Sequence, residues 1–341
     1  MELSKIVTAL NVYCHPNLAE SWDNVGLLVE PTPPHNVKTI LITNDLSDQV
    51  VDEAIKSNCG LIFSYHPPIF VPFKRMTQAN WKKRNIIKCI ENKIGIYSPH
   101  TCLDGKEDGL NDFLLSPFEL SSKVSVTPPG FMNDDVYEAT ANYDENFKRF
   151  SLAMPIAPTA VDIQSATGRV AKFKYPKSQK DNIHEMLKKH NITLLTEEVI
   201  TRPQPMGQGS GRVGMLQSKK TIKDIVEAYK TLLGTSQIKV AFGKKKGLND
   251  EATCIAVCAG SGGKLLTCQA PALLADVLVT GEASHQEQLE AISRGATMII
   301  IGHATVERKY LSAKVLPWMK SELTNVDIIF AETDKDPVEI V

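Results

Sequence analysis

Four of the eight histidines stand directly after predicted β-strands, where acidic residues also gather. The four are His66, His100, His285 and His303. In an open parallel sheet, ligands bind beyond the carboxyl ends of the strands. We therefore expect these imidazoles to lie at a binding or catalytic site.

The sharpest pair is His303 and Glu307, four residues apart at the start of a predicted helix. Side chains at positions i and i+4 project from one helix face, about one turn apart, so both can reach a single ion. His100 and Asp104 repeat this spacing. Imidazole with carboxylate suits Zn, Mn, Fe or Ni at a hydrolytic centre, and a carboxylate can bridge two ions about 3.5 to 4 Å apart. The alternative for each histidine is a helix cap or a backbone hydrogen bond.

Three other segments leave two interpretations open. Gly209–Gly214 matches GxGxxG but lacks the strand-to-helix context of a dinucleotide site, so we predict a tight turn. Ala259–Gly263 lies between a predicted strand and a helix, and is either a cradle for a phosphate or carboxylate or a plain turn. The turn Trp22–Gly26 either lines a pocket or is a capped turn with a buried tryptophan.

Two stretches alternate short apolar runs with amphipathic ones, which predicts strands and helices in turn. The first predicts β-α-β-α-β at Lys38–Thr43, Asp48–Ser57, Leu61–Tyr65, Ala79–Glu91 and Ile94–Ser98. The second predicts strands at Cys254–Cys258, Asp276–Thr280, Thr297–Ile301 and Val326–Phe330, with helices from Gly263, at Ser284–Arg294 and at Ala304–Leu323. Continuous apolar strands separated by helices predict an α/β fold with mostly parallel sheets covered on both faces.

Two segments rich in Ser, Pro, Asn or Gly, Ser121–Asp135 and Ile200–Gly214, resemble linkers. The segment between them predicts strands and helices at Tyr137–Tyr143, Glu145–Met154, Thr159–Ala166, Arg169–Tyr175, Ser178–His190 and Ile192–Glu198. This βαββαβ order is that of a ferredoxin-like α+β domain. We therefore expect an N-terminal half at 1–120, an inserted domain at 136–199 and a C-terminal half at 207–341.

The composition favours a globular protein in a reducing compartment. The 341 residues are 43% hydrophobic and 23% charged, with 38 Lys+Arg against 39 Asp+Glu, so neither disorder nor nucleic-acid binding is indicated. The seven cysteines show no CxxC pairing, which indicates a reduced, intracellular setting. We see no signal peptide or membrane span, and expect a cytoplasmic protein.

Six motifs in this order resemble the Nif-three-like family, also called GTP cyclohydrolase I type 2 homologues. The motifs are Ser21–Leu28, Ser64–Phe70, Ser98–Asp104, Gly209–Gly214, Thr280–His285 and Gly302–Arg308. The likeness runs from Leu18 to Val341, and it is greatest to the eukaryotic members, whose Glu-Ser-Trp-Asp-Asn-Val-Gly opening and Ala-Glu-Thr-Asp-Lys-Asp-Pro-like ending are shared.

The resemblance implies a composite domain of two α/β halves with a dinuclear metal site between them, often in a toroidal homohexamer. The implied ligands are His66, Asp104, His303 and Glu307. His100 and His285 fall within matching motifs and are implied neighbours in the first or second shell. Bacterial members have His-His where this chain has Tyr65-His66, so one expected ligand is absent. The inserted segment stands where larger members carry an extra ferredoxin-like domain.

Our preferred hypothesis is a metal-dependent hydrolase or GTP cyclohydrolase-like enzyme that uses a metal-activated water, with one or two ions of Zn, Mn, Fe or Ni. His100 or His285 would transfer the proton. The candidate pocket residues are Tyr65, Trp22, Asp23 and Asn24. The alternative is a non-catalytic, metal-bound regulatory or scaffold protein with protein partners, acting in transcription and so also nuclear. The missing ligand at Tyr65 favours the scaffold, and the retained carboxylates favour the enzyme.

Overall fold

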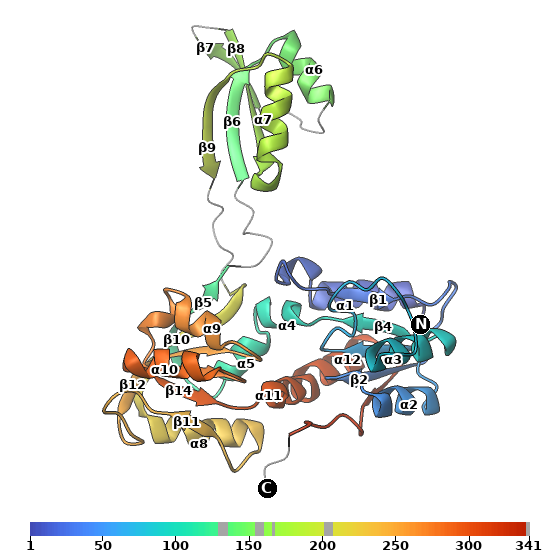
Figure 1. Ribbon diagram of the computed structural model, residues 1–341, viewed down its shortest axis with the longest axis vertical. Helices are drawn as coiled ribbons and strands as arrows, with labels where there is room; N and C mark the ends of the chain where they lie inside the picture. Colours follow the sequence, from blue (N-terminus) through green and yellow to red (C-terminus); the bar gives the residue numbers. More distant parts are fainter. Residues whose placement is uncertain (129–135, 154–159, 166–167, 201–206, 339–341) are drawn as a thin grey trace. The chain divides into compact units, whose positions relative to one another are not determined.

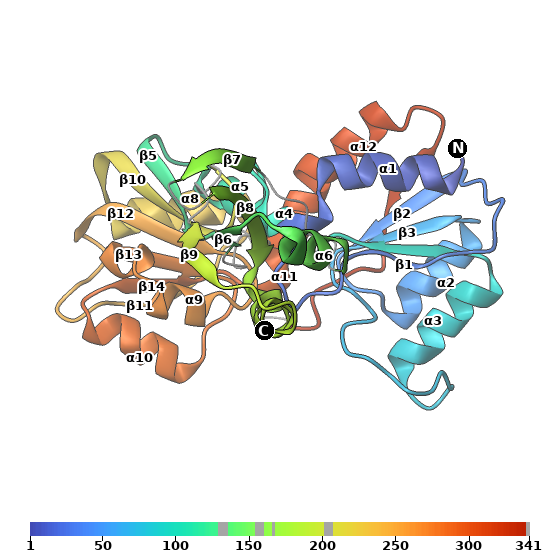
Figure 2. The ribbon, with the colours of Figure 1, turned by 90° about the horizontal axis from the view of Figure 1, so that it is seen from above.

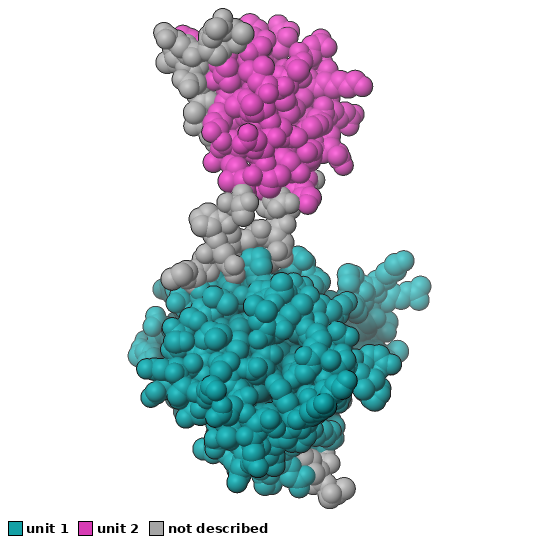
Figure 3. All heavy atoms as spheres, turned by 90° about the vertical axis from the view of Figure 1, so that its left-hand side faces the viewer, with its two compact units in different colours: residues 1–129, 206–341 teal, residues 130–205 magenta. Residues whose placement is uncertain are grey.

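The computed structural model describes residues 1–128, 136–153, 160–165, 168–200 and 207–338. The chain divides into two compact units (Figure 3). Unit 1 comprises Met1–Pro129 and Met206–Val341, and unit 2 is the segment Gly130–Pro205. None of the helices in the described part of the chain has the length and apolar character needed to cross a membrane.

The first sheet of unit 1 has five strands in the order β1-β4-β3-β2-β15. They are β1 (Gly26–Val29), β2 (Thr39–Thr43), β3 (Leu61–Ser64), β4 (Gly95–Ser98) and β15 (Asp327–Phe330). β1 is antiparallel to β4, and the other neighbours are parallel. One face is covered by α1 (Leu3–Tyr13) and α12 (Leu316–Glu322), the other by α2 (Asp48–Lys56) and α3 (Trp81–Glu91) (Figure 2).

The side chains of β2 show why both faces need a helical cover. Ile40 and Ile42 pack into the core that contains α1, whereas Leu41 packs into the core that contains α2. All three are fully buried, as expected for a central strand of a parallel sheet. After the strand the chain turns, and the Ser47 hydroxyl caps α2 by accepting a hydrogen bond from the Val50 N–H.

The second sheet of unit 1 has six strands in the order β11-β14-β13-β12-β10-β5. They are β5 (Leu120–Thr127), β10 (Ser210–Thr221), β11 (Lys239–Ala241), β12 (Glu251–Cys258), β13 (Val277–Thr280) and β14 (Thr297–Ile300). β12, β13 and β14 are parallel, and the other pairs are antiparallel. Its helices are α8 (Ile222–Leu233), α9 (Gly263–Cys268) and α10 (His285–Ser293).

The two sheets share one hydrophobic core. This cluster contains Ile42 and Phe63 of the first sheet together with Ile255 and Ile299 of the second. Between the sheets lie α4 (Thr101–Gly105), α5 (Leu110–Leu115) and α11 (His303–Tyr310), and a π-helical turn, Leu311–Val315, connects α11 to α12 (Figures 1 and 2). The region between the sheets is therefore where the strand exits of both can meet.

Unit 2 has its own sheet and core. Its elements are β6 (Val136–Asn142), α6 (Glu145–Ala153), β7 (Ala160–Ser165), β8 (Gly168–Pro176), α7 (Lys180–Lys189) and β9 (Leu194–Ile200). The antiparallel strand order is β7-β8-β6-β9. Phe147, Phe150 and Phe173 form the centre of its core. The element order matches the predicted βαββαβ sequence, although the predicted ends at Met154, Thr159 and Ala166 lie outside the described residues.

Two expectations about unit 1 are wrong. The predicted linkers contain strands: β5 occupies most of the described part of Ser121–Asp135, and β10 begins within Ile200–Gly214. Residues 129–135 and 201–206 of these segments lie outside the described residues. In the motif predicted to be a tight turn, Gly209 and Gly211 have φ of 117° and 61°, but the strand already starts at Ser210. The last predicted strand of the C-terminal half, β15, pairs with β2 of the first sheet.

Candidate metal centre

Three metal-competent side chains converge where the two sheets of unit 1 meet. His66 follows β3, while His303 and Glu307 lie on α11, which follows β14. Each offers one ligand atom, and these atoms lie within 4.8 Å of one another. The His66 Nε2 is 3.5 Å from one Glu307 oxygen, and the His303 Nε2 is 3.8 Å from the other. A histidine from one sheet thus faces the i,i+4 pair of the other.

The start of α11 sets the direction of two of these side chains. Gly302 has φ of 91°, a conformation that residues with a Cβ rarely adopt, and the helix begins at the next residue. One turn later, Glu307 is only 1% exposed. Its carboxylate accepts a hydrogen bond of 3.1 Å from the side-chain amide of the buried Asn44. The helix therefore carries one imidazole at the entrance of the site and one carboxylate inside it.

The second nitrogen of each imidazole is held by a carboxylate. The His66 Nδ1 lies 2.9 Å from Asp45 Oδ1, and the His303 Nδ1 lies 3.1 Å from Glu282 Oε2. An ionised carboxylate only accepts hydrogen bonds, so in a neutral imidazole the proton lies on Nδ1 and the lone pair on Nε2. Carboxylates of this kind fix the orientation of metal-binding histidines and raise their basicity. Both Nε2 lone pairs therefore face Glu307.

Because Glu307 is buried, its ionised carboxylate is unfavourable unless a cation lies beside it. Burial and the nearby Asp104 carboxylate raise the pKa of Glu307 well above its usual range, against the hydrogen bond from Asn44. Among the described residues no Lys or Arg forms an ion pair with Glu307, and the Oδ1 of Asn44 is buried without a hydrogen-bond partner. Two imidazole nitrogens, a buried carboxylate and a free amide oxygen fit a divalent cation of the Zn, Mn, Fe or Ni kind.

The surroundings of Asp45 stabilise the ionised form of its carboxyl group. Burial raises the pKa of its carboxyl, but the hydrogen bond and charge of His66 lower it more, and Arg308 adds to this, so the pKa is about 2. The Arg308 guanidinium lies 3.1 Å from Asp45 and 3.0 Å from Asp334, which in turn accepts a hydrogen bond from the Asn44 N–H. The charge pair therefore fixes both the His66 partner and the loop after β2.

Asp104 and Tyr65 form a second polar pair beside the three side chains. The Tyr65 hydroxyl donates a hydrogen bond of 2.7 Å to Asp104 Oδ1. Burial raises the pKa of Asp104 to about 6, against the charge of His100 and the bond from Tyr65. Burial and the same carboxylate raise the pKa of Tyr65 well above 10, so the phenol is neutral. Asp104 is outside the group of three whose ligand atoms converge.

His100 is held in a strained conformation next to His66. Its backbone has φ of 35° and ψ of −120°, which is rare for a residue with a side chain. Its Nδ1 lies 2.7 Å from Asp23 Oδ1, and its ring centroid lies 5.5 Å from that of His66. The Asp23 side chain is fully buried. Burial raises the pKa of its carboxyl, but the hydrogen bond and charge of His100, together with the bonds from Thr101 and Asn24, lower it below its usual range. Strain at such a position points to a functional role.

Comparison with known proteins identifies the family of this chain. The family described as Duf34/NIF3 (NGG1p interacting factor 3) matches residues 1–337. The chain belongs to the DUF34/NIF3 family. It is 33% identical over 355 residues to NIF3-like protein 1 of Homo sapiens, covering 100% of this chain and 93% of the human protein.

More distant members of the family share the fold. The GTP cyclohydrolase 1 type 2 homolog of Bacillus subtilis is 26% identical over 353 residues, covering 94% of this chain and 93% of that protein. The crystal structure of a Bacillus cereus protein related to NIF3 has a TM-score of 0.69 at 22% identity, covering 100% of this chain and 99% of the other. These likenesses show the fold of the NIF3 family.

His285 is apart from the other predicted site residues of this NIF3-family chain. It is the first residue of α10, its side chain is exposed, and its neighbour Ser284 caps the helix together with Glu287. No hydrogen bond or ring contact in the described residues connects it with the three converging side chains. Its proposed role in proton transfer stays a prediction.

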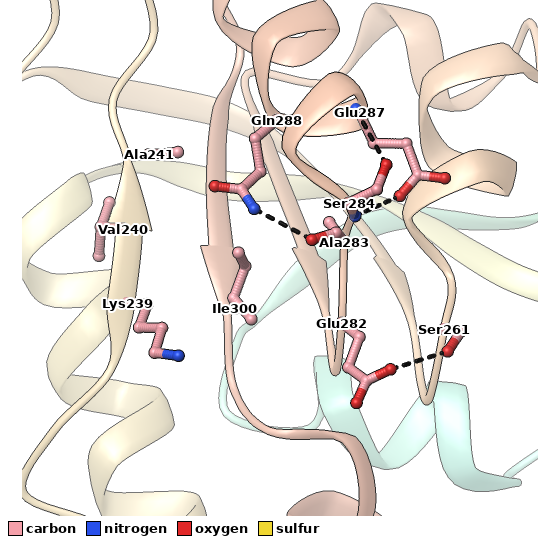
Figure 4. A pocket seen from close by; sticks show the side chains of 10 residues that line it. All are labelled: Lys239, Val240, Ala241, Ser261, Glu282, Ala283, Ser284, Glu287, Gln288 and Ile300. Atoms are coloured by element: carbon pink, nitrogen blue, oxygen red, sulfur yellow. Dashed lines mark hydrogen bonds between the residues drawn. The ribbon is translucent and has the colours of Figure 1, made fainter. Parts of the chain in front are cut away.

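A cavity of about 760 Å³ lies beside Glu282, the partner of the His303 Nδ1 (Figure 4). Glu282 lines it and accepts a hydrogen bond of 3.1 Å from the Ser261 hydroxyl, through the same oxygen that faces His303. Lys239 and Gln288 also line it. Ser261 belongs to the glycine-rich segment after β12, whose role the sequence left open. In the fold of this NIF3-family chain, that segment borders the candidate centre.

Sequence reasoning missed the partners that hold these residues. Asp45 and Glu282 directly follow β2 and β13, so their position at strand exits was a usable signal. Asp334 lies in the ending shared with eukaryotic family members, but no pattern connects it with Arg308. Arg212, in the motif Gly209–Gly214, also has a structural role. It is fully buried, lies 3.1 Å from Asp112, and donates a hydrogen bond of 2.9 Å to the Lys106 carbonyl.

Proposed function

We propose that this chain is a metal-dependent hydrolase whose ion is held by His66, His303 and Glu307, with Asp104 as a further ligand. The observation that carries the proposal is the meeting of two Nε2 lone pairs at one buried carboxylate, with both Nδ1 atoms held by other carboxylates. Burying this carboxylate is unfavourable in the metal-free protein, and binding of a cation offsets that cost.

When bound, a divalent ion lowers the pKa of a water toward neutrality and polarises a substrate carbonyl or phosphoryl oxygen. The residues of the chain divide the remaining tasks. The His100 Nε2 accepts the proton, because Asp23 holds its Nδ1 proton and stabilises the charged ring. The neutral Tyr65 phenol holds Asp104 in place.

The neutral phenol also bears on the number of ions. Tyr65 occupies the position where the resemblance implies a histidine, and a buried phenol with a raised pKa is a poor ligand. We therefore propose one tight site and one weak site for Zn, Mn, Fe or Ni. Because the B. subtilis relative is named a GTP cyclohydrolase 1 type 2 homolog, we extend the proposal to cyclohydrolase chemistry, in which water opens a ring C–N bond.

Metal analysis and a hydrolase screen test the proposal. The purified protein should contain about one tightly bound ion per chain, and His303→Ala or Glu307→Ala should remove it. His15→Ala is the matched control, because His15 is exposed and caps a short 3-10 helix. Substrates with hydrolysable C–N, ester and phosphate bonds should be screened with each added metal. Metal binding without turnover for any metal would favour the scaffold alternative, and no metal binding would reject both.

We also propose that unit 2 is an inserted ferredoxin-like domain at about 136–199, between host halves at 1–120 and 207–341. Its βαββαβ order, its strand order β7-β8-β6-β9 and its separate core support this. The host halves are interleaved, because β15 completes the first sheet. The resemblance further suggests that the chain forms a homo-oligomer, with six copies in a complete ring. Light scattering of the purified protein would measure the number of copies.

A further inference from the structure

Two aromatic rings remain exposed at the edge of the candidate metal centre. Trp22 is 58% exposed and Phe70 is 43% exposed. Their ring centroids are 5.9 Å apart and their planes meet at 68°, so the rings form the two walls of a corner. The corner adjoins His100, whose ring lies 6.0 Å from Trp22 and 6.2 Å from Phe70. His100 in turn neighbours His66, so the corner is continuous with the centre.

The backbone on both sides of the corner is fixed. The Asn24 side chain donates a hydrogen bond of 2.6 Å to the carbonyl of Ile69, which connects the turn carrying Trp22 with the loop carrying Phe70. The Asp23 side chain is fully buried and accepts hydrogen bonds from both His100 and Thr101. The exposed rings are therefore attached to residues that the fold holds in place, and their separation does not depend on contacts made by the rings themselves.

Exposed rings on a rigid frame favour a planar ligand. An exposed aromatic ring gives up the large favourable free energy of burying its apolar area, and exposed apolar patches commonly mark binding sites. A planar heteroaromatic ring can stack on one wall and meet the second wall with its edge, which is the preferred aromatic geometry. The adjacent His100 supplies a polar group for the nitrogen and oxygen atoms of such a ring. An aliphatic ligand would use neither feature.

We infer that Trp22 and Phe70 bind a planar heteroaromatic ring of the nucleobase class, carried by the substrate of the neighbouring centre. This inference rests on the proposed function, because it places the ring beside the residues that would carry out hydrolysis. Trp22 and Phe70 would then position the substrate and determine its specificity. The bond that is hydrolysed would lie on the other side of His100, next to His66.

Equilibrium binding of AMP and GMP, with ribose 5-phosphate as the matched ligand without a base, tests the inference. Both nucleotides should bind more tightly than ribose 5-phosphate to the chelator-treated protein. Trp22→Ala and Phe70→Ala should each weaken nucleotide binding about 5- to 150-fold, the range for stacking on one aromatic side chain, and should leave ribose 5-phosphate binding unchanged. Trp22→Phe, which keeps a ring, should retain most of the affinity.

Trp81→Ala is the matched control, because Trp81 is also exposed, at 45%, and in the described residues it makes no ring contact with the histidines. It should not change nucleotide binding. Equal binding of nucleotides and ribose 5-phosphate would overturn the inference. So would a change in oligomer mass in Trp22→Ala without a change in affinity, since the corner would then be a contact between copies. Metal content, measured separately on the same variants, reports on the proposed function alone.

Discussion

The carboxylates behind the two histidines are the residues whose roles are most open to direct test. Glu282→Gln keeps the shape of the side chain but removes the charge that holds the His303 Nδ1 proton. We expect metal affinity about 10- to 100-fold lower, the usual effect of losing such a partner. Competition with a chromogenic chelator measures it. Glu290→Gln on the exposed face of α10 is the control, and equal affinities of the two variants would show that Glu282 does not orient His303.

Tyr65 differs from the ligand set that the resemblance implies. Because its phenol is buried, neutral and bonded to Asp104 Oδ1, Tyr65 occupies one oxygen of a proposed metal ligand and supplies no ligand itself. Tyr65→His should raise bound metal per chain toward two, as measured by elemental analysis, and should raise any turnover. Tyr65→Phe is the matched variant, since it frees Asp104 without adding a ligand. Unchanged stoichiometry with lower activity in Tyr65→His would instead give Tyr65 a role of its own.

Asp104 and Asp45 should act on stability in separate pH ranges. The pKa of Asp104 rises from 3.8 to about 6 on folding. Between these values the unfolded chain loses its proton first, so the free energy of unfolding of chelator-treated protein should fall as pH rises. The pKa of Asp45 is lowered to about 2, so its contribution is lost only as pH falls below 3.8.

Urea unfolding between pH 4.5 and 6.5 isolates the Asp104 contribution. Asp104→Asn should make the pH dependence flatter, and Glu307, whose pKa is also raised, should account for the slope that remains. A slope identical to that of the unmodified protein would mean that Asp104 titrates normally in the folded state.

At the scale of single residues, the sequence could predict which side chains gather but not what holds them. His66, His303 and Glu307 stand at strand exits, and parallel strands bring their exits to one edge. The pairing of His66 with Asp45 joins residues 21 apart, and that of Arg308 with Asp334 joins helix α11 to the loop after β15. Such pairs depend on how the sheets meet, which no local pattern records.

Among the elements, the exits of β12, β13 and β14 lie so close together that a side chain is excluded. A Cβ on Gly281 would lie 2.7 Å from the Gly260 carbonyl oxygen, 2.9 Å from the His303 Cα and 3.0 Å from the Gly302 oxygen. All three are backbone atoms. Gly281→Ala must therefore push these loops apart, which should cost about 1 to 3 kcal/mol of stability and weaken metal binding.

Gly247→Ala is the matched control for this change. A Cβ there would meet nothing nearer than an Asp250 oxygen at 3.9 Å. Thermal unfolding and metal titration of both variants decide the question. Equal behaviour would show that the loops adjust freely, and that their close approach does not position His303.

The predicted elements hold best where a strand is continuous and apolar. Strands at β2, β3, β12 and β13 and helices α2 and α10 appear within a few residues of their expected bounds. The strands β5 and β10 were missed because Ser, Lys and Gly along them resemble a linker, and pairing with each other makes them strands. The crossing of β15 to the first sheet could not be predicted, because an apolar run does not specify its neighbour.

In the whole molecule, the ends of unit 2 leave unit 1 from neighbouring strands. Thr127 of β5 pairs with Ser210 of β10, and paired antiparallel residues lie about 4.5 to 5.5 Å apart. A short Gly/Ser linker can therefore replace Gly130–Pro205. Since the core of unit 2 contains residues of that unit alone, we expect the shortened chain to unfold cooperatively and to bind metal as tightly as the full chain.

Residues 130–205 alone should fold and show a separate unfolding transition, because this piece keeps the whole core around Phe147, Phe150 and Phe173. Calorimetry of the two pieces and the full chain makes the comparison. Independent units predict two transitions in the full chain that match those of the pieces, since their free energies of unfolding then add. Loss of metal together with loss of cooperative unfolding in the shortened chain would show instead that unit 2 is an integral part of the fold that builds the centre.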